Sequence, residues 1–196
     1  MNQLLASLAF VLICAPLALH AHPAGEIKRI KGDPEAPILT GAIVPSGVTL
    51  YYLSGQVPSV TDPSQPAGSR ESYGDTKTQA ISVFGKIDKL LQEQGLRLGD
   101  VVKLTVYLVG DPKNGGKLDF KGFNEAYLQF FGTPAQPNLV ARTTVQVAAL
   151  ANPAFLVEIE ATAAKGGSPE KTAKPKPAAA APAAKPAAAP TPTAKP

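Results

Sequence analysis

The chain has 196 residues and a formal net charge of +4, with 44% hydrophobic and 17% charged residues. This length allows one domain of ordinary size together with terminal extensions. Cys14 is the only cysteine and Met1 the only methionine. Cys14 lies in an apolar N-terminal run, so the rest of the chain contains no cysteine. A thiol nucleophile, a disulfide and a thiolate metal site are therefore excluded there.

The two ends of the chain differ in composition from its middle. Residues 1–21 form an apolar run that ends in small residues, which predicts a secretory signal peptide and a periplasmic or secreted protein. Residues 165–196 are rich in Ala, Pro and Lys and predict a disordered tail. Six lysines against one glutamate give this tail a charge of +5, so residues 22–164 carry −1.

The tail has two interpretations. It is either a solvated spacer or a contact to an anionic envelope surface, which a cationic segment attracts through screened charge. No aromatic residues interrupt its lysines, so it does not predict specific nucleic-acid binding through base stacking.

The first part of the middle region predicts three strands, a loop and a helix. Strands are expected at 26–31, 41–45 and 49–55, the last two as a hairpin around Ser46-Gly47. A polar loop follows at 57–74. The helix begins at Asp75 or Thr76, ends at a left-handed Gly95, and contains Gly85, which predicts close packing on the sheet. Its apolar stripe consists of Ala80, Val83, Phe84, Ile87, Leu90 and Leu91.

The second part predicts three strands and one helix. The clearest strand covers 100–109, a helix rich in Phe and Tyr covers about 119–131, and closing strands cover 138–147 and 155–163. The order ββ(β)αβαββ predicts an α/β (α+β) fold, a two-layer sandwich in which two helices cover one face of a mixed sheet. The other face must then be solvated or buried against another subunit.

The closing strands contain a candidate site. Alternation places Arg142, Thr144 and Gln146 on one face of their strand, and Glu158 and Glu160 together on one face of the next. A guanidinium can grip a carboxylate through two hydrogen bonds, and a glutamate can position or activate water. These residues predict either a site for a small acid with a reactive carbon beside its carboxyl group, or a cross-strand ion pair.

Five segments, in this order, resemble the Rid family of reactive intermediate deaminases, also called YjgF-type proteins. The resemblance covers residues 49–163 and rests on Leu53-Ser-Gly-Gln-Val-Pro58, on the helix end and strand start between Leu90 and Val102, on Asp119-Phe-Lys-Gly-Phe-Asn124 with the helix that follows, on Ala141-Arg-Thr-Thr-Val-Gln-Val147, and on Val157-Glu-Ile-Glu-Ala161.

This resemblance implies a chorismate-mutase-like Rid fold and a homotrimer with ligand clefts between subunits. It implies hydrolysis of 2-imino acids, and of their enamine forms, to 2-keto acids and ammonia without a metal or an organic cofactor. Arg142 corresponds to the arginine that grips the substrate carboxylate, and Glu158 to the glutamate that positions water. The implied substrate-binding residues are Ser54, Gly55, Asn124 and Thr144, where Thr144 replaces a cysteine of some members.

The chain departs from the family in one respect that bears on function. The family often has a Gly-Pro-Tyr segment whose tyrosine contacts the ligand, whereas residues 38–42 read Ile-Leu-Thr-Gly-Ala. The loop at 59–74 is also longer than usual. The alternative to an exported imine deaminase is therefore a noncatalytic small-carboxylate-binding or envelope-tethered interaction protein on the same scaffold.

Overall fold

The computed structural model describes residues 25–166, and every element named below lies in that range. The predicted signal peptide, and the predicted tail beyond residue 166, lie outside the described residues. The last strand continues to Gly166, slightly past the predicted domain end at 164.

Four strands form one mixed sheet in the order β3-β6-β4-β5. They are β3 (Val48–Gln56), β4 (Val101–Val109), β5 (Ala141–Val147) and β6 (Val157–Gly166). β6 is antiparallel to both of its neighbours, whereas β4 and β5 are parallel. Because a parallel pair needs a crossover connection, the chain passes through α3 (Phe120–Tyr127) between these two strands.

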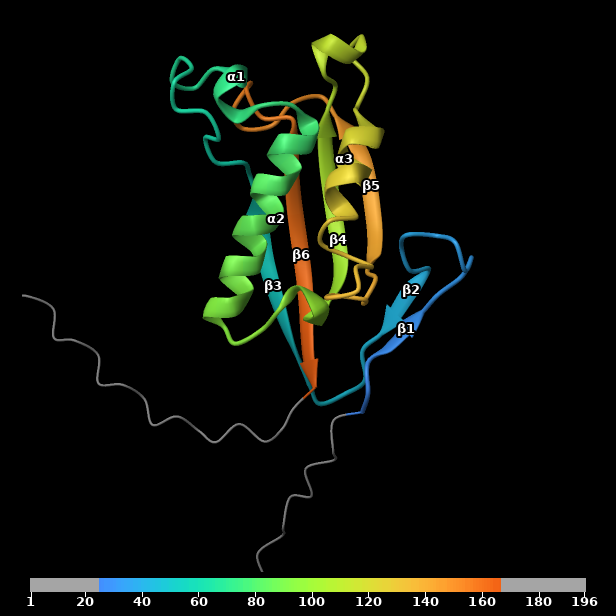
Figure 1. The fold of residues 1–196 in the computed structure, drawn as a ribbon. Coiled ribbons are helices and arrows are strands. Elements are labelled where there is room, and N and C mark those ends of the chain that lie inside the picture. Colours follow the sequence, from blue (N-terminus) through green and yellow to red (C-terminus); the bar gives the residue numbers. More distant parts are fainter. Residues whose placement is uncertain (1–24, 167–196) are drawn as a thin grey trace, which may run out of the picture.

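Two helices, α2 (Thr76–Glu93) and α3, lie on the same face of this sheet (Figure 1), which confirms the predicted two-layer fold. The Asp75 carboxylate caps α2 by accepting a hydrogen bond from the Thr78 N–H. Gly95 follows the helix with φ of 69°, and the Leu96 N–H donates to the Leu91 carbonyl. This is a Schellman motif, so the predicted helix limits are confirmed.

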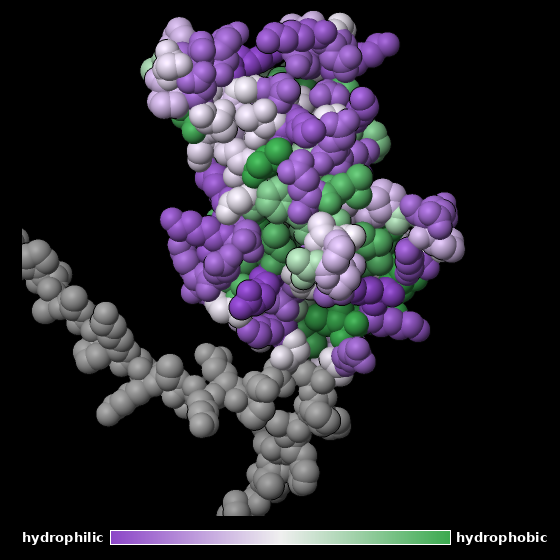
Figure 2. Space-filling model, in the orientation of Figure 1, coloured by the Kyte–Doolittle hydropathy of each residue, from purple (hydrophilic) through white to green (hydrophobic). Residues whose placement is uncertain are grey.

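The hydrophobic core lies between the helices and the sheet. Leu104, Val106 and Leu108 of β4 point into it and are fully buried, as the alternation of a strand requires. The predicted stripe of α2 is buried except for Leu90, which is 36% exposed. Figure 2 shows this side of the molecule, with hydrophilic residues over its loop end and apolar side chains gathered in the middle.

The opposite sheet face has a polar middle and apolar edges. Register places Lys103, Thr105, Tyr107, Glu158 and Glu160 on its central strands, and Leu50, Tyr52, Val145 and Val147 on its edge strands. Tyr52 is 77% exposed, and within residues 25–166 no helix packs on this face. The face is therefore left open in the single chain.

The predicted hairpin between 41–45 and 49–55 is wrong. β2 (Gly41–Ile43) pairs with β1 (Lys28–Ile30), and β3 pairs with β6. The Arg29 guanidinium attaches this two-stranded arm to the body by donating to the carbonyls of Gly99, Val101 and Leu139. A turn signal indicates where the chain reverses, but long-range contacts such as these decide which strand it meets.

Two predictions about the helices are also wrong. The second helix ends at Tyr127, and Phe130 and Phe131 follow it in turns, although both rings still pack on Phe84 with centroids 5.1 and 5.7 Å away. Gly85 is exposed, and a β-carbon there would meet no other atom within 4 Å. The sheet does not approach it closely.

The loop between β3 and α2 contains the short helix α1 (Arg70–Tyr73), and 3-10 turns occur at Leu98–Asp100 and Pro112–Asn114. No helix among residues 25–166 combines the length and the apolar character that a membrane span requires.

Candidate active site

Arg142 lies on the helix-covered face of β5, an edge strand. It is paired in register with Leu104 of β4, whose side chain points into the core. Its Nη2 donates to Oδ1 of Asn124, on α3, at 2.8 Å. The strand and the helix thus hold the guanidinium between them.

Three aromatic rings surround this guanidinium. Its Cζ lies 4.6 Å from the ring centroid of Tyr127, 5.1 Å from that of Phe123 and 5.7 Å from that of Phe120. Burial lowers the pKa of Arg142, and the nearby Tyr127 opposes this shift. An arginine stays protonated at neutral pH, so the rings enclose a cation and attract it through their faces.

The cation keeps an unused donor. Nη1 of Arg142 and Oγ1 of Thr144 are buried, and neither has a hydrogen-bond partner among the described residues. Within residues 25–166 no carboxylate lies within 4 Å of the Arg142 guanidinium. The ion-pair interpretation is therefore wrong for this chain, since neither Glu158 nor Glu160 pairs with Arg142.

A second group of predicted residues gathers at the β3–β6 pair. A β-carbon on Gly55 would lie only 1.9 Å from Oε1 of Glu158, so the half-buried glutamate side chain packs directly against this glycine. Ser54, the preceding residue, lines a hollow of about 290 Å³ together with Lys103 and Glu160. Glu160 accepts a hydrogen bond of 3.1 Å from the Tyr107 hydroxyl, which raises the pKa of Tyr107.

The two groups lie on opposite faces of the sheet. Arg142 pairs with Leu104 on the helix-covered face, whereas Glu158 pairs with Tyr107 on the open face. β4 separates their strands, which places the two backbones on the order of 10 Å apart. One chain therefore brings together Arg142, Asn124 and Thr144, and separately Ser54, Gly55 and Glu158, but not Arg142 with Glu158.

The segment where the family often has a tyrosine is built differently here. Leu39 is 6% exposed, and its N–H donates to the Val140 carbonyl. The ring of Tyr127 contacts Arg142, and its hydroxyl donates a hydrogen bond of 3.0 Å to the Pro37 carbonyl. Neither Tyr51 nor Tyr52 of the same chain replaces the family's tyrosine beside Arg142, because Tyr51 packs against the core and Tyr52 lies on the open face.

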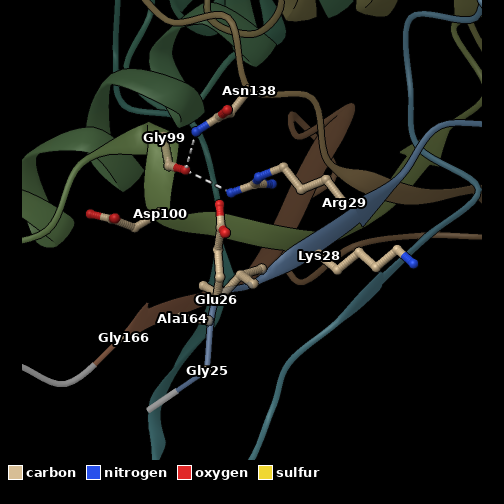
Figure 3. Close-up of a pocket in the computed structure, with 10 residues that line it drawn as sticks. Gly25, Glu26, Lys28, Arg29, Gly99, Asp100, Asn138, Ala164 and Gly166 are labelled. Carbon is tan, nitrogen blue, oxygen red and sulfur yellow. Dashed lines mark hydrogen bonds between the residues drawn. The ribbon is translucent and has the colours of Figure 1, made fainter. Parts of the chain in front are cut away.

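A hollow of about 1050 Å³ lies beside β1 and the end of β6 (Figure 3). Three of the polar side chains that line it, those of Arg29, Asn138 and Asp100, are already engaged. Arg29 and Asn138 both donate to the Gly99 carbonyl, and the Asp100 carboxylate accepts from the Arg97 N–H. The Arg29 bond attaches the arm to the body.

Sequence reasoning missed the rings around Arg142. The sequence presents Phe120, Phe123 and Tyr127 only as members of a helix rich in Phe and Tyr. Their spacing of three and four residues, together with Asn124, puts all four on neighbouring positions of α3. That spacing was the available signal. In the part of the chain that the structure describes, no group of three or more His, Cys, Asp or Glu side chains is placed to hold a metal.

The fold and these residues define an α+β sandwich. A half-buried arginine with one unpaired donor lies on its edge strand, and a glutamate that packs against a glycine lies on the opposite face. The sequence pattern of the family described as endoribonuclease L-PSP matches residues 40–165. A RutC family protein of Aquifex aeolicus is 38% identical over 144 residues, which cover 71% of this chain and all of that protein.

A protein of Escherichia coli named "Putative reactive intermediate deaminase TdcF" is 33% identical over 142 residues, 71% of this chain and 98% of that one. The solved structure of the Rid family protein YyfB of Yersinia pestis superposes with a TM-score of 0.53 at 24% identity, covering 70% of this chain and 97% of that one. The chain belongs to the YjgF/Rid family, as its motifs predicted.

Proposed function

We propose that this protein hydrolyses 2-imino acids, and their enamine forms, to 2-keto acids and ammonia. The observation that carries the proposal is the buried Nη1 of Arg142, which has no partner among residues 25–166. A buried charged donor left unpaired costs several kcal/mol, about 1–3 even for a neutral group, so such a donor marks a position where an acceptor belongs.

A small carboxylate suits this position. One of its oxygens can accept from Nη1 of Arg142, and the second can accept from the unpaired hydroxyl of Thr144 on the same face of β5. Asn124 already holds Nη2, so the guanidinium is oriented before a ligand arrives. The surrounding rings exclude water and strengthen the attraction between guanidinium and carboxylate.

The water-positioning group must come from a second copy. Glu158 cannot reach a ligand held by Arg142 of the same chain, because it lies on the other face of the sheet. The open face carries apolar Leu50 and Tyr52 at its β3 edge and apolar Val145 at its β5 edge. If the β3 edge of one copy packs beside the β5 edge of the next, the apolar edges are buried and the two groups meet.

Such a contact joins two different surfaces, so identical contacts must close into a ring or continue as a filament. The ring of three that the family resemblance implies is our proposal for this chain. In it the polar middle of each sheet faces the ring axis, and each of the three clefts takes Arg142 from one copy and Glu158 from its neighbour.

The reaction then needs little beyond orientation. Arg142 holds the substrate's carboxylate. The electrophilic imine carbon C2 is bonded to this carboxylate and faces the neighbouring copy. Glu158 accepts a proton from a water molecule whose oxygen bonds to C2, and the C=N electrons move to nitrogen, which takes up a proton. Glu158 returns the water proton to this nitrogen. It then passes the proton of the new hydroxyl to the amino group as the C–N bond breaks, so ammonia leaves and the 2-keto acid remains.

A noncatalytic carboxylate-binding protein is the second candidate. It is favoured by Leu39, which is buried and hydrogen-bonded where the family often has its ligand-contacting tyrosine. Such a protein would bind 2-keto acids through Arg142 without accelerating imine hydrolysis. The predicted signal peptide at residues 1–21 supports an envelope location for either candidate, and fractionation of cells that express the full chain tests it.

The test generates imines with an amino-acid oxidase and lets the protein compete with semicarbazide, which traps them. We expect the purified protein to lower semicarbazone formation, and Arg142→Ala to abolish the effect. If wild type and Arg142→Ala compete equally, deaminase function is refuted. Calorimetry with pyruvate then separates the candidates, because a binding protein still releases heat that Arg142→Ala lacks.

A further inference from the structure

We propose that Phe120 is the apolar wall on which the substrate's side chain packs, so that this chain prefers 2-imino acids with aliphatic or aromatic side chains. This inference rests on the proposed function and adds a substrate class to it. It starts from two facts about one side chain: Phe120 is 46% exposed, and its ring lies beside Arg142, at 5.7 Å from Cζ.

The position of Phe120 is fixed from both sides. It is the first residue of α3, whose N-cap Asp119 accepts a hydrogen bond of 2.9 Å from the Gly122 N–H. The loop before the helix is held by Gln146 of β5. Its Oε1 accepts from the Leu118 N–H at 3.0 Å, and its Nε2 donates to the Gly116 carbonyl. The ring is therefore supported by the strand that carries Arg142.

Phe120 is also the one ring of the three that a ligand can touch. Phe123 and Tyr127 are fully buried, so their contact with Arg142 is internal. An exposed phenyl group next to an unpaired guanidinium donor combines the two parts of a site for an amphipathic acid. The buried rings hold the cation, and the exposed ring is left for the ligand.

The geometry directs the ligand's side chain toward this wall. A carboxylate carbon bound to a guanidinium lies roughly 4 Å from Cζ, and the side chain branches from the next carbon. A ring 5.7 Å from Cζ is then within van der Waals reach, about 3.5–4 Å, of the first side-chain carbons.

The charged neighbours do not compete for this role. Lys121 and Glu125 are 3.5 Å apart, and Glu125 also pairs with Lys77 at 2.8 Å. Glu125, the carboxylate of α3, is therefore already engaged with two cations. The wall offers apolar surface and no free charge of its own, so it favours imines derived from leucine or phenylalanine over those derived from polar amino acids.

The test compares kcat/KM for the imines of leucine and alanine in three variants. In Phe120→Ala we expect the leucine-to-alanine ratio to fall about 10-fold, the lower end of the discrimination that one methylene provides in a hydrophobic pocket. Phe120→Leu should retain the ratio. Leu128→Ala, which removes another exposed apolar side chain beyond the other end of α3, should leave it unchanged.

Several results would overturn the inference while leaving the proposed function intact. One is an equal loss for both imines in Phe120→Ala, which means that the ring acts only on Arg142. Another is a Leu128→Ala effect of the same size. Calorimetry with 4-methyl-2-oxopentanoate and pyruvate gives a second readout that needs no turnover: the affinity ratio must fall in Phe120→Ala alone. Failure of the proposed function is a different result, namely no turnover of either imine by wild type.

Discussion

Gly55 provides the sharpest test of the water-positioning role of Glu158. A β-carbon at this position would lie 1.9 Å from Oε1 and 2.8 Å from Cδ of Glu158, whereas ordinary contact begins at 3.4 Å. In Gly55→Ala the carboxylate must therefore move by about 1.5 Å. A displacement of about 1 Å in a catalytic group can cost roughly 100-fold in rate.

We therefore expect Gly55→Ala to lower kcat about 100-fold or more in the semicarbazide competition assay. Binding of 2-keto acids, measured by calorimetry, should change little, because the ligand's carboxylate is held in the proposed cleft by Arg142 of the neighbouring copy, and the added methyl group displaces only the Glu158 side chain. The fold should persist, since the atoms that clash belong to the flexible end of a side chain. Thermal unfolding and size-exclusion chromatography check this.

Gly85→Ala is the matched control, because it makes the same chemical change in open space. A β-carbon there meets no atom within 4 Å, and the residue is exposed in the middle of α2. Its activity should equal that of wild type, and its free energy of unfolding should rise by about 0.5–1 kcal/mol, the helix penalty of glycine relative to alanine. A Gly55→Ala variant with wild-type kcat would refute the water-positioning role of Glu158.

Three further predictions follow from the fold and the site. The variants Arg142→Ala and Glu158→Gln should each be inactive alone. When they are refolded together in equal amounts, about a quarter of wild-type activity should return, because one cleft in four then receives both intact residues. No recovery would contradict a shared cleft. Asp75→Ala should lower the free energy of unfolding by about 1 kcal/mol, whereas Asp75→Asn, which can still cap, should not. The hydrogen bond from the Thr78 N–H lowers the pKa of Asp75, so the ionised carboxylate stabilises the fold at pH values above its unfolded pKa. In denaturant titrations, the difference in free energy of unfolding between wild type and Asp75→Ala should disappear as the pH falls through the lower folded pKa. Tyr127→Phe should cost about 1 kcal/mol of stability by leaving the Pro37 carbonyl without its donor, yet retain activity because the ring on Arg142 remains; a large loss of kcat would show that the hydroxyl itself serves the site.

Local sequence signals predicted the elements whose causes are local. The limits of α2 follow from a capping aspartate and a left-handed glycine, both within a turn of the helix, so they could be read directly. The end of α3 could not, because its aromatic residues continue past Tyr127 while the backbone turns. Packing on Phe84 explains why Phe130 and Phe131 are apolar without being helical.

Sequence alone also determined the family and singled out Arg142, Asn124, Thr144, Glu158, Ser54 and Gly55, because motif order and strand alternation are properties of the chain itself. Only the tertiary structure decided that β2 pairs with β1, since hydrogen bonds that Arg29 donates to carbonyls about 70–110 positions away hold that arm. It likewise decided which face each strand presents, because alternation gives two faces and only pairing register says which one the helices cover. That choice separates Arg142 from Glu158 in one chain, which is why the site that we propose takes its other half from a second copy.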